Sequence, residues 1–186
     1  MRHLAAALSL LLACSASPPP SPGTPSPGTS SPAPTAGACP GEIHAVAGLK
    51  EVDDPALLQQ ALGKSGEGKL CAGKVFEATA PVTVHRVWNK SEARTLQGRW
   101  WSFERPRGPT DDYRRQNAIC PEWSPLDVVS TCRVKVGARL VVGSGQSVTC
   151  KETSFPASPV NQVFIPNDGK NNVLHVEDCS PGDPWP

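Results

Sequence analysis

A run of 24 residues without a charged or aromatic side chain limits where this chain can fold. Residues 15–38 contain only Ser, Ala, Pro, Gly and Thr, and eight of them are proline. Such a segment cannot bury enough apolar surface to offset the entropy of ordering its backbone, and proline stiffens it towards an extended form. The sequence therefore predicts a disordered tether here, and it confines the folded domain to residues 39–186.

The residues before the tether have the pattern of an export signal. Arg2 gives a positive start, and residues 4–13 are small or apolar except for Ser9. A basic start followed by a short apolar stretch is typical of a signal peptide, and this stretch is too short to cross a bilayer. The sequence thus predicts a signal peptide over residues 1–13.

The end of this signal, Leu11-Leu12-Ala13-Cys14, resembles the lipobox of bacterial lipoproteins. The resemblance implies cleavage before Cys14 and attachment of a diacylglyceryl group to its thiol. Two or three acyl chains anchor a protein stably, because each buried methylene contributes about 0.8 kcal/mol. We therefore expect lipidated Cys14 and its tether, residues 14–38, to hold the domain on a membrane of the bacterial cell envelope. The outer membrane or cell surface is favoured over the inner membrane.

The domain of residues 39–186 carries every charged residue except Arg2, and the formal net charge of the whole chain is +1. A nucleic-acid-binding protein usually has a basic face, so no nucleic-acid partner is expected. A metal site is not expected either, because no closely spaced cysteine pair has histidines nearby. An even number of cysteines in an exported domain predicts disulfides. The six that remain beside Cys14 are Cys39, Cys71, Cys120, Cys132, Cys150 and Cys179.

The pairing of these six cysteines stays open at the level of the sequence. The favoured arrangement joins Cys132 to Cys150 across a predicted hairpin. A second disulfide in this arrangement joins Cys39 or Cys71 to Cys179 or Cys120. Three disulfides would compensate for a modest hydrophobic core, because the loss of one typically costs about 2–5 kcal/mol.

Apolar periodicity and turn residues predict a β-dominated α+β fold with short helices. One helix is expected over residues 55–62, where Asp53 or Asp54 can cap the start and Gly63 ends it, and a second over 111–118. Strand residues run through 74–88 with a break near Pro81. Residues 128–136 and 139–142 predict a hairpin that turns at Gly137. Further strands are expected over residues 147–150, 160–165 and 172–176.

Three short segments contain residues suited to chemistry. They are Val84-His85-Arg86-Val87-Trp88, Gly98-Arg99-Trp100-Trp101-Ser102 and Gln162-Val163-Phe164-Ile165-Pro166. A cation in the middle of a strand is costly to bury without an anionic partner. Adjacent tryptophans in a strand must face opposite sides of the sheet.

Each of these features also has a purely structural interpretation. Arg86 can be a surface cation on an edge strand, or it can pair with Asp111 or Asp112. The tryptophans can belong to the core. Gln162 can simply form a hydrogen bond across strands.

The order of the three segments resembles that of ADP-ribosyltransferase-like domains in secreted bacterial toxins, over roughly residues 82–167. The resemblance implies two small packed sheets around such a core, with NAD as substrate and no permanently bound cofactor. It also implies that Arg86 holds the NAD phosphates or ribose and that Trp100 or Trp101 packs beneath the nicotinamide ring. Ser102 would line the nicotinamide pocket. Gln162 would occupy the position of the catalytic glutamate.

The glutamine departs from the family pattern. Cleavage of the glycosidic bond of NAD builds positive charge on the ribose, which a carboxylate stabilises better than a neutral amide. The sequence therefore leaves open an NAD glycohydrolase, a weak ADP-ribosyltransferase or an inactive fold that binds. The alternative function is a non-catalytic envelope module that binds a protein or a glycan through exposed tryptophans such as Trp123 or Trp185.

Overall fold

The computed structural model describes residues 38–186. The predicted signal peptide, the lipidation site Cys14 and the tether up to residue 37 lie outside the described residues. No helix in the described part is long and apolar enough to span a membrane.

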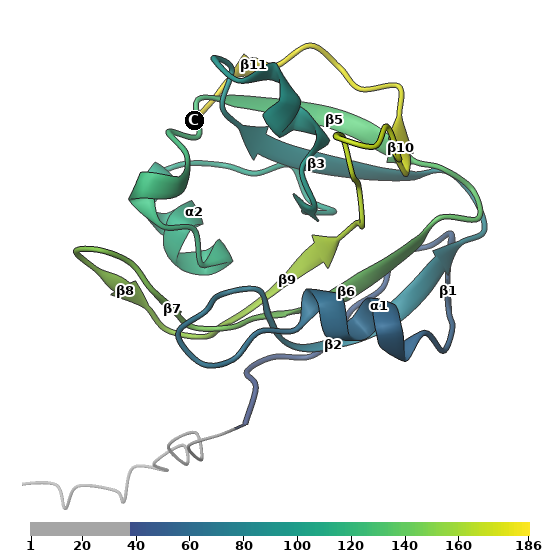
Figure 1. Cartoon of the computed structure of the whole chain (residues 1–186), viewed down its shortest axis with the longest axis horizontal. Coiled ribbons are helices and arrows are strands. Elements are labelled where there is room, and N and C mark those ends of the chain that lie inside the picture. Colours follow the sequence, from purple (N-terminus) through teal and green to yellow (C-terminus); the bar gives the residue numbers. More distant parts are fainter. Residues whose placement is uncertain (1–37) are drawn as a thin grey trace, which may run out of the picture. The chain divides into compact units, whose positions relative to one another are not determined.

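Two antiparallel sheets face each other, with a helix at one open side between them (Figure 1). The larger sheet has the order β1 (Leu49–Glu51), β2 (Leu70–Ala78), β6 (Arg139–Gly145), β9 (Ser158–Phe164) and β4 (Trp100–Trp101). In the second sheet, β5 (Val128–Val134) lies between β3 (Val82–Trp88) on one edge and β10 (Val176–Glu177) and β11 (Asp183–Pro184) on the other. A small hairpin pairs β7 (Val148–Thr149) with β8 (Ser154–Phe155).

The main core lies between the two sheets, because both contribute buried side chains to one cluster. Leu140, Val142 and Val163 come from the larger sheet, and Val84 and Val134 from the smaller one. The fold is therefore β-dominated with two packed sheets, as the sequence predicts.

The two sheets are also joined through their backbones at one side. The amide of His85 in β3 donates to the carbonyl of Ser102, just after β4, at 2.8 Å. The amide of Ser102 donates back to the His85 carbonyl at 2.9 Å. This bridge fixes β4, and thus the two tryptophans, against the strand that carries Arg86.

Both predicted helices are present. Helix α1 (Pro55–Ala61) begins where the Asp54 carboxylate accepts the amide of Leu57 at 3.0 Å, and its first residue is proline. Leu57 packs against the outer face of the larger sheet. Helix α2 (Thr110–Asn117) ends at Ala118, whose backbone is left-handed. Two short 3₁₀ helices, η1 (Ala93–Gln97) and η2 (Pro121–Trp123), follow β3 and α2.

The predicted hairpin of residues 128–142 is wrong, although both of its strands exist. β5 pairs with β3, whereas β6 pairs with β2 and β9 in the other sheet. The reason lies in the burial of β6, in which every residue after Arg139 is buried. A strand with two buried faces belongs in the middle of a sheet, so the chain crosses from one sheet to the other at residues 135–138.

The remaining predicted strands differ from the structure in extent. Residues 147–150 contain β7, and residues 160–165 correspond to β9. The strand predicted over residues 172–176 is shorter and later in the structure, where Val176 and Glu177 of β10 pair with β5.

All six cysteines of the domain form disulfides, but the favoured pairing is wrong. The bonds join Cys39 to Cys71, Cys120 to Cys150 and Cys132 to Cys179. The pairing of Cys132 with Cys150 assumed the hairpin between β5 and β6. Cys132 lies instead beside the C-terminal segment that runs along the free edge of β5.

Candidate functional site

A cavity of about 260 Å³ brings together most of the residues that the sequence singled out. Its walls include Arg86 from β3, Trp100 and Trp101 from β4, and Gln162 from β9. Ser102 does not line this cavity. It faces a separate open groove of about 830 Å³, and its hydroxyl donates to the Glu104 carbonyl at 2.8 Å.

Arg86 is a desolvated cation in the wall of the cavity. Its Nε donates to the carbonyl of Thr95 at 2.8 Å, and its Nη1 donates to that of Trp100 at 2.5 Å. No carboxylate in residues 38–186 forms a salt bridge with it, and Asp112 pairs with Arg115 instead. Burial lowers the pKa of Arg86 to about 10, so the guanidinium is still charged at neutral pH. The interpretation of Arg86 as the partner of Asp111 or Asp112 is therefore wrong, whereas its position on the edge strand β3 agrees with the other interpretation, although the side chain is half-buried rather than fully exposed.

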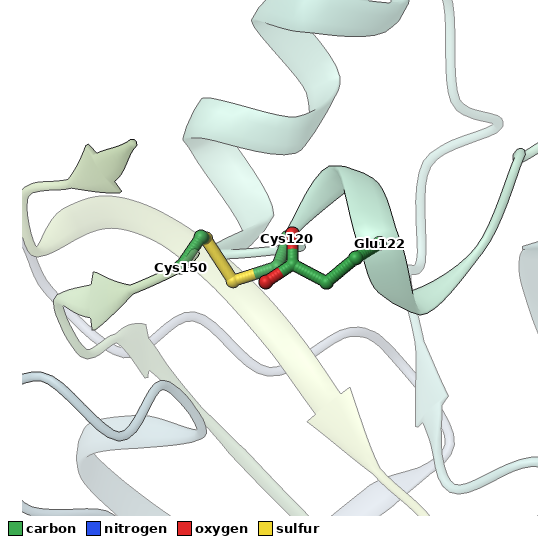
Figure 2. Close-up of side chains that lie close together, drawn as sticks. All are labelled: Cys120, Glu122 and Cys150. Carbon is green, nitrogen blue, oxygen red and sulfur yellow. A yellow bond between two sulfur atoms is a disulfide. The ribbon is translucent and has the colours of Figure 1, made fainter. Parts of the chain in front are cut away.

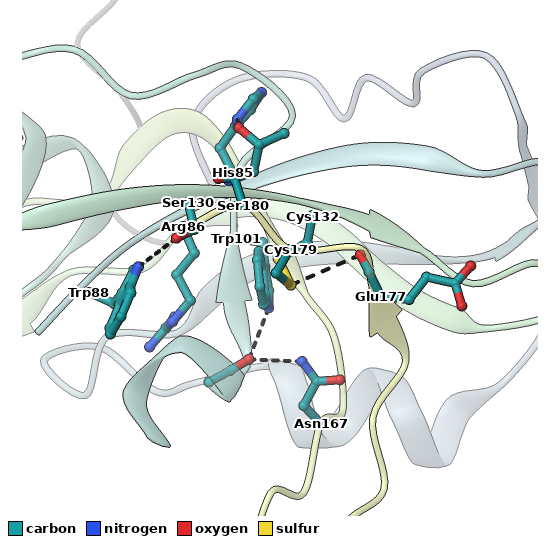
Figure 3. The surroundings of a disulfide bond; sticks show 12 residues. His85, Arg86, Trp88, Trp101, Ser130, Cys132, Asn167, Glu177, Cys179 and Ser180 are labelled. Atoms are coloured by element: carbon teal, nitrogen blue, oxygen red, sulfur yellow. Dashed lines mark hydrogen bonds between the residues drawn. A yellow bond between two sulfur atoms is a disulfide. The ribbon is translucent and has the colours of Figure 1, made fainter. Parts of the chain in front are cut away.

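Gly98 allows the backbone to pass close to the guanidinium of Arg86. A Cβ at residue 98 would lie 2.1 Å from Nη2 of Arg86, so a larger residue here would displace the guanidinium from its present position. The Gly98 carbonyl accepts the indole Nε1 of Trp101 at 2.9 Å and the Asn167 amide at 3.1 Å (Figure 3). The glycine and the second tryptophan of Gly98-Arg99-Trp100-Trp101 thus act together to seat Arg86.

The two tryptophans face opposite sides of the larger sheet, as predicted. Trp101 belongs to the core between the sheets, and its ring centroid lies 5.9 Å from Cζ of Arg86. Trp100 packs edge to face on Phe164, with 5.1 Å between ring centroids. Both also reach the cavity, so the interpretation as core residues describes only part of what they do.

Gln162 is buried, with 4% of its surface exposed. Its Nε2 has no hydrogen-bond partner within the described residues, so the predicted bond across strands is not formed by this atom. A Cβ at Gly145 would lie 2.7 Å from Nε2, which shows how tightly the amide is held. A buried donor without a partner costs about 1–3 kcal/mol.

Helix α2 contributes a tyrosine that sequence reasoning did not select. Tyr113, the only tyrosine of the chain, lines both the cavity and the open groove. Burial raises the pKa of Tyr113 to about 12, against the opposing effect of the Arg86 cation. Its ring packs on Trp185 with 5.0 Å between centroids. Its uniqueness in the chain was the one signal that could have marked it.

The outer wall of the cavity is formed by residues 118–126, which sequence reasoning also missed. Arg114 is 7% exposed and donates to the carbonyls of Cys120 at 3.2 Å, Ser124 at 2.7 Å and Pro125 at 3.2 Å. The disulfide from Cys120 to Cys150 ties the same segment to β7 (Figure 2). This wall is therefore held in place from two directions.

Three non-glycine residues in the wall have left-handed backbones. Lys69, Ala118 and Leu126 have φ of 65°, 52° and 59°, and all three line the cavity. Such conformations cost roughly 1–2 kcal/mol each. Strain of this kind concentrates where surrounding structure enforces a site.

The sulfurs of Cys120 and Cys150 lie close to the carboxylate of Glu122, as metal ligands would (Figure 2). The two cysteines are joined in a disulfide, and a metal requires thiolates. Glu122 accepts the amide of Lys151 at 2.9 Å. In this oxidised form the three residues stabilise the fold rather than bind a metal.

The two tryptophans proposed as exposed binding residues differ. Trp123 is 57% exposed and lies in the cavity lining. Trp185 is buried, with 7% exposure, and its Nε1 donates to the Pro106 carbonyl at 3.1 Å. The expectation of an exposed Trp185 is therefore wrong, because this ring fills the space between Tyr113 and the second sheet.

Comparisons of the chain with protein-family models, with curated proteins and with solved structures found no match. The residues themselves define the site: a small cavity in a disulfide-bonded β-rich domain, with a half-buried cation, two tryptophans and an unpartnered amide.

Proposed function

We propose that this chain is a bacterial lipoprotein whose exported domain binds NAD in the cavity beside Arg86 and hydrolyses it slowly to nicotinamide and ADP-ribose. The observation that carries the proposal is the half-buried guanidinium of Arg86 in the cavity wall, which donates to two carbonyls but forms no salt bridge with a carboxylate of residues 38–186. A partly desolvated charge without a counter-charge is unfavourable, and an anionic ligand would supply the missing counter-charge. The guanidinium fork is well suited to phosphate.

The other walls of the cavity support a flat ring beside the anion. Trp100 and Trp101 offer aromatic surface within the same cavity as Arg86. The volume of about 260 Å³ lies at the lower end for small-molecule sites. It suits the nicotinamide end of NAD rather than the whole dinucleotide. The resemblance to ADP-ribosyltransferase-like toxins, on the segments around Arg86, Gly98 and Gln162, is a further reason for the proposal, although Ser102 of the same pattern lies outside the cavity.

The expected reaction is slow because of Gln162. Hydrolysis breaks the bond between the nicotinamide nitrogen and C1′ of the ribose, water supplies the new oxygen on C1′, and one proton is released. The positive charge that develops on the ribose meets only an amide dipole at residue 162. Among residues 38–186, Glu92 is the only carboxylate that lines the cavity, but it is exposed and pairs with Arg94 at 3.3 Å.

The test is release of nicotinamide from NAD by the full chain, purified in detergent and followed by chromatography. Arg86→Ala should abolish release, and Arg86→Lys should reduce it strongly because a lysine cannot replace the fork. Arg133→Ala is the matched control. Arg133 is an exposed arginine of the neighbouring strand β5 and pairs with Asp178. Equal activity of wild type and Arg86→Ala would refute the proposal.

The envelope location is a part of the same proposal. Three disulfides within residues 38–186 are typical of proteins that mature outside a reducing cytosol. Lipid on Cys14 would then make the membrane the partner of the chain. Cys14→Ser should move the protein from the membrane fraction to the soluble fraction, and recovery of this variant in membranes would refute the anchor.

A second candidate is a non-catalytic module that binds an envelope protein or glycan. The 57% exposure of Trp123 is the observation that favours it. This function predicts no release of nicotinamide by wild type, so the same assay separates the two.

A further inference from the structure

The cavity opens beside an exposed tryptophan on a fixed segment. Trp123 is the only aromatic residue among the exposed large hydrophobic residues in the described part of the chain. It is also one of the cavity-lining residues. Exposure of so large an apolar ring at the mouth of a cavity is unfavourable in water, and a ligand that covers it removes this cost.

The position of Trp123 is set by its own backbone rather than by burial of its ring. Its amide donates to the Cys120 carbonyl at 3.0 Å. Arg114 holds the carbonyl of the next residue, Ser124, at 2.7 Å, and Glu122 accepts the amide of Lys151. With the neighbouring Cys120 in a disulfide, the indole is presented by a segment that needs little ordering on binding. Preorganisation of this kind favours affinity.

A second basic residue borders the same cavity. Lys69 is exposed and lines the cavity. The residue before it, Gly68, lies against the indole, since a Cβ there would be 3.7 Å from Cη2 of Trp123. No acidic side chain forms a salt bridge with Lys69 within residues 38–186; its Nζ contacts only the Gln60 carbonyl, at 3.5 Å. The cavity therefore has one cation in its wall, Arg86, and borders a second basic residue, Lys69, whose exposed ammonium lies at the carbonyl of Gln60, outside the cavity lining.

This arrangement fits a ligand longer than the cavity. We infer that Trp123 is a stacking platform for the adenine of NAD and that Lys69 faces the pyrophosphate as it leaves the cavity. The inference rests on the proposed function and adds to it the subsite for the second half of the dinucleotide. Base stacking on an aromatic side chain is tolerant of sequence and is worth enough to separate a dinucleotide from a mononucleotide.

The experiment compares NAD with nicotinamide mononucleotide, which lacks the adenosine half. Dissociation constants of both are measured by calorimetry on the full chain in detergent. Trp123→Ala should weaken NAD about 5- to 150-fold, the range expected for one stacked base, and leave the mononucleotide unchanged. Trp123→Phe should keep most of the NAD affinity. Val136→Ala, at an exposed apolar residue that does not line the cavity, is the matched control and should change neither.

Lys69 has a separate readout. Lys69→Gln should weaken NAD and reduce the dependence of its affinity on salt, because an exposed cation acts through a screened charge. The thermal midpoint of each variant should match that of wild type, since both Trp123 and Lys69 are exposed.

The outcomes separate the platform from the proposed function. If wild type binds both nucleotides and Trp123→Ala weakens both equally or neither, the platform is wrong and the proposed function stands. If wild type binds neither nucleotide, the proposed function fails and the platform falls with it. If Trp123→Ala instead abolishes binding of an envelope protein or glycan while NAD affinity is unchanged, Trp123 belongs to the rival function and the platform is overturned.

Discussion

Substitution of Gly98 by alanine tests how tightly the cavity wall holds Arg86. The new Cβ would lie 2.1 Å from Nη2, 2.3 Å from Cζ and 2.8 Å from Nε of Arg86, and no other atom is among the nearest contacts. Ordinary contact begins at 3.4 Å, so the guanidinium must move by roughly 1.3 Å, the difference between 3.4 and 2.1 Å. Backbone strain plays no part, because φ of Gly98 is −68°.

The expected cost follows from what the displaced guanidinium loses. Hydrogen bonds to charged groups are worth about 1.5–3 kcal/mol each, and the donation to either Thr95 or Trp100 is lost when the fork shifts. Overpacking adds about 1–3 kcal/mol where the neighbours cannot relax. Because the clash at Gly98 is with the far end of a side chain that can move, we count the lost hydrogen bond alone. We expect Gly98→Ala to lower the free energy of unfolding by about 1.5–3 kcal/mol, which corresponds to about 3–12 °C in thermal midpoint for a domain of this size.

A double-mutant cycle isolates this contact. In an Arg86→Ala background the clashing atoms are gone, and Gly98→Ala should be neutral or slightly stabilising through its effect on the unfolded chain. Unfolding of the four proteins is followed by circular dichroism with the disulfides intact. A coupling energy of about 1.5–3 kcal/mol is expected. Additive effects of the two substitutions would refute the seating of Arg86 by Gly98.

Three further predictions concern the amide, the wall and the histidines. Gln162→Met should raise the thermal midpoint, because it removes an unpartnered buried donor that costs about 1–3 kcal/mol. A lower midpoint would contradict the finding that the Gln162 amide has no hydrogen-bond partner. Gln162→Glu should speed release of nicotinamide in the chromatographic assay. Replacement of Cys120 and Cys150 by serine should lower the free energy of unfolding by about 2–5 kcal/mol and weaken NAD binding in calorimetry. Unchanged NAD affinity would show that the cavity wall of residues 118–126 does not depend on the disulfide. Burial lowers the pKa of both His85 and His175 below the usual 6.5, so their contribution to stability is complete above pH 6.5 and is lost as pH falls through the folded values. Replacement of both by asparagine should flatten the fall in thermal midpoint between about pH 7 and pH 5. An unchanged dependence of the midpoint on pH would exclude the two histidines as the source of that fall.

The sequence predicted helix starts well, because a helix cap depends only on neighbouring residues. Asp54 and Pro55 fix the start of α1 through a cap and a preset φ, and the helix begins there. The partners of β5 and β6 could not be predicted in the same way. Strand pairing is a non-local choice, and an apolar run is consistent with any sheet that buries both faces. The disulfide prediction failed with it, because the pairing of Cys132 depended on the hairpin.

The sequence predicted only those residues of the candidate site that lie on β-strands. Arg86, the two tryptophans and Gln162 stood out as residues unusual for their strands, and the fold gathers them in one cavity. Ser102 is only one residue beyond Trp101, yet it faces the groove on the other side. Tyr113 and the wall of residues 118–126 gave little signal, because their placement depends on the Arg114 contacts and a disulfide between distant segments.

The cavity is distinguished by how many unfavourable features it collects. The half-buried, unpaired cation of Arg86, the unpartnered amide of Gln162 and the exposed ring of Trp123 are each unusual in a folded domain, and the amide and the left-handed backbones of Lys69 and Leu126 also lower stability. A sequence selected for stability alone would scatter such features or remove them. All of them border the same space in this fold. A ligand with a phosphate, a hydrogen-bonding edge and a flat ring relieves the first three at once, so the cavity and its rim are best explained as one binding site.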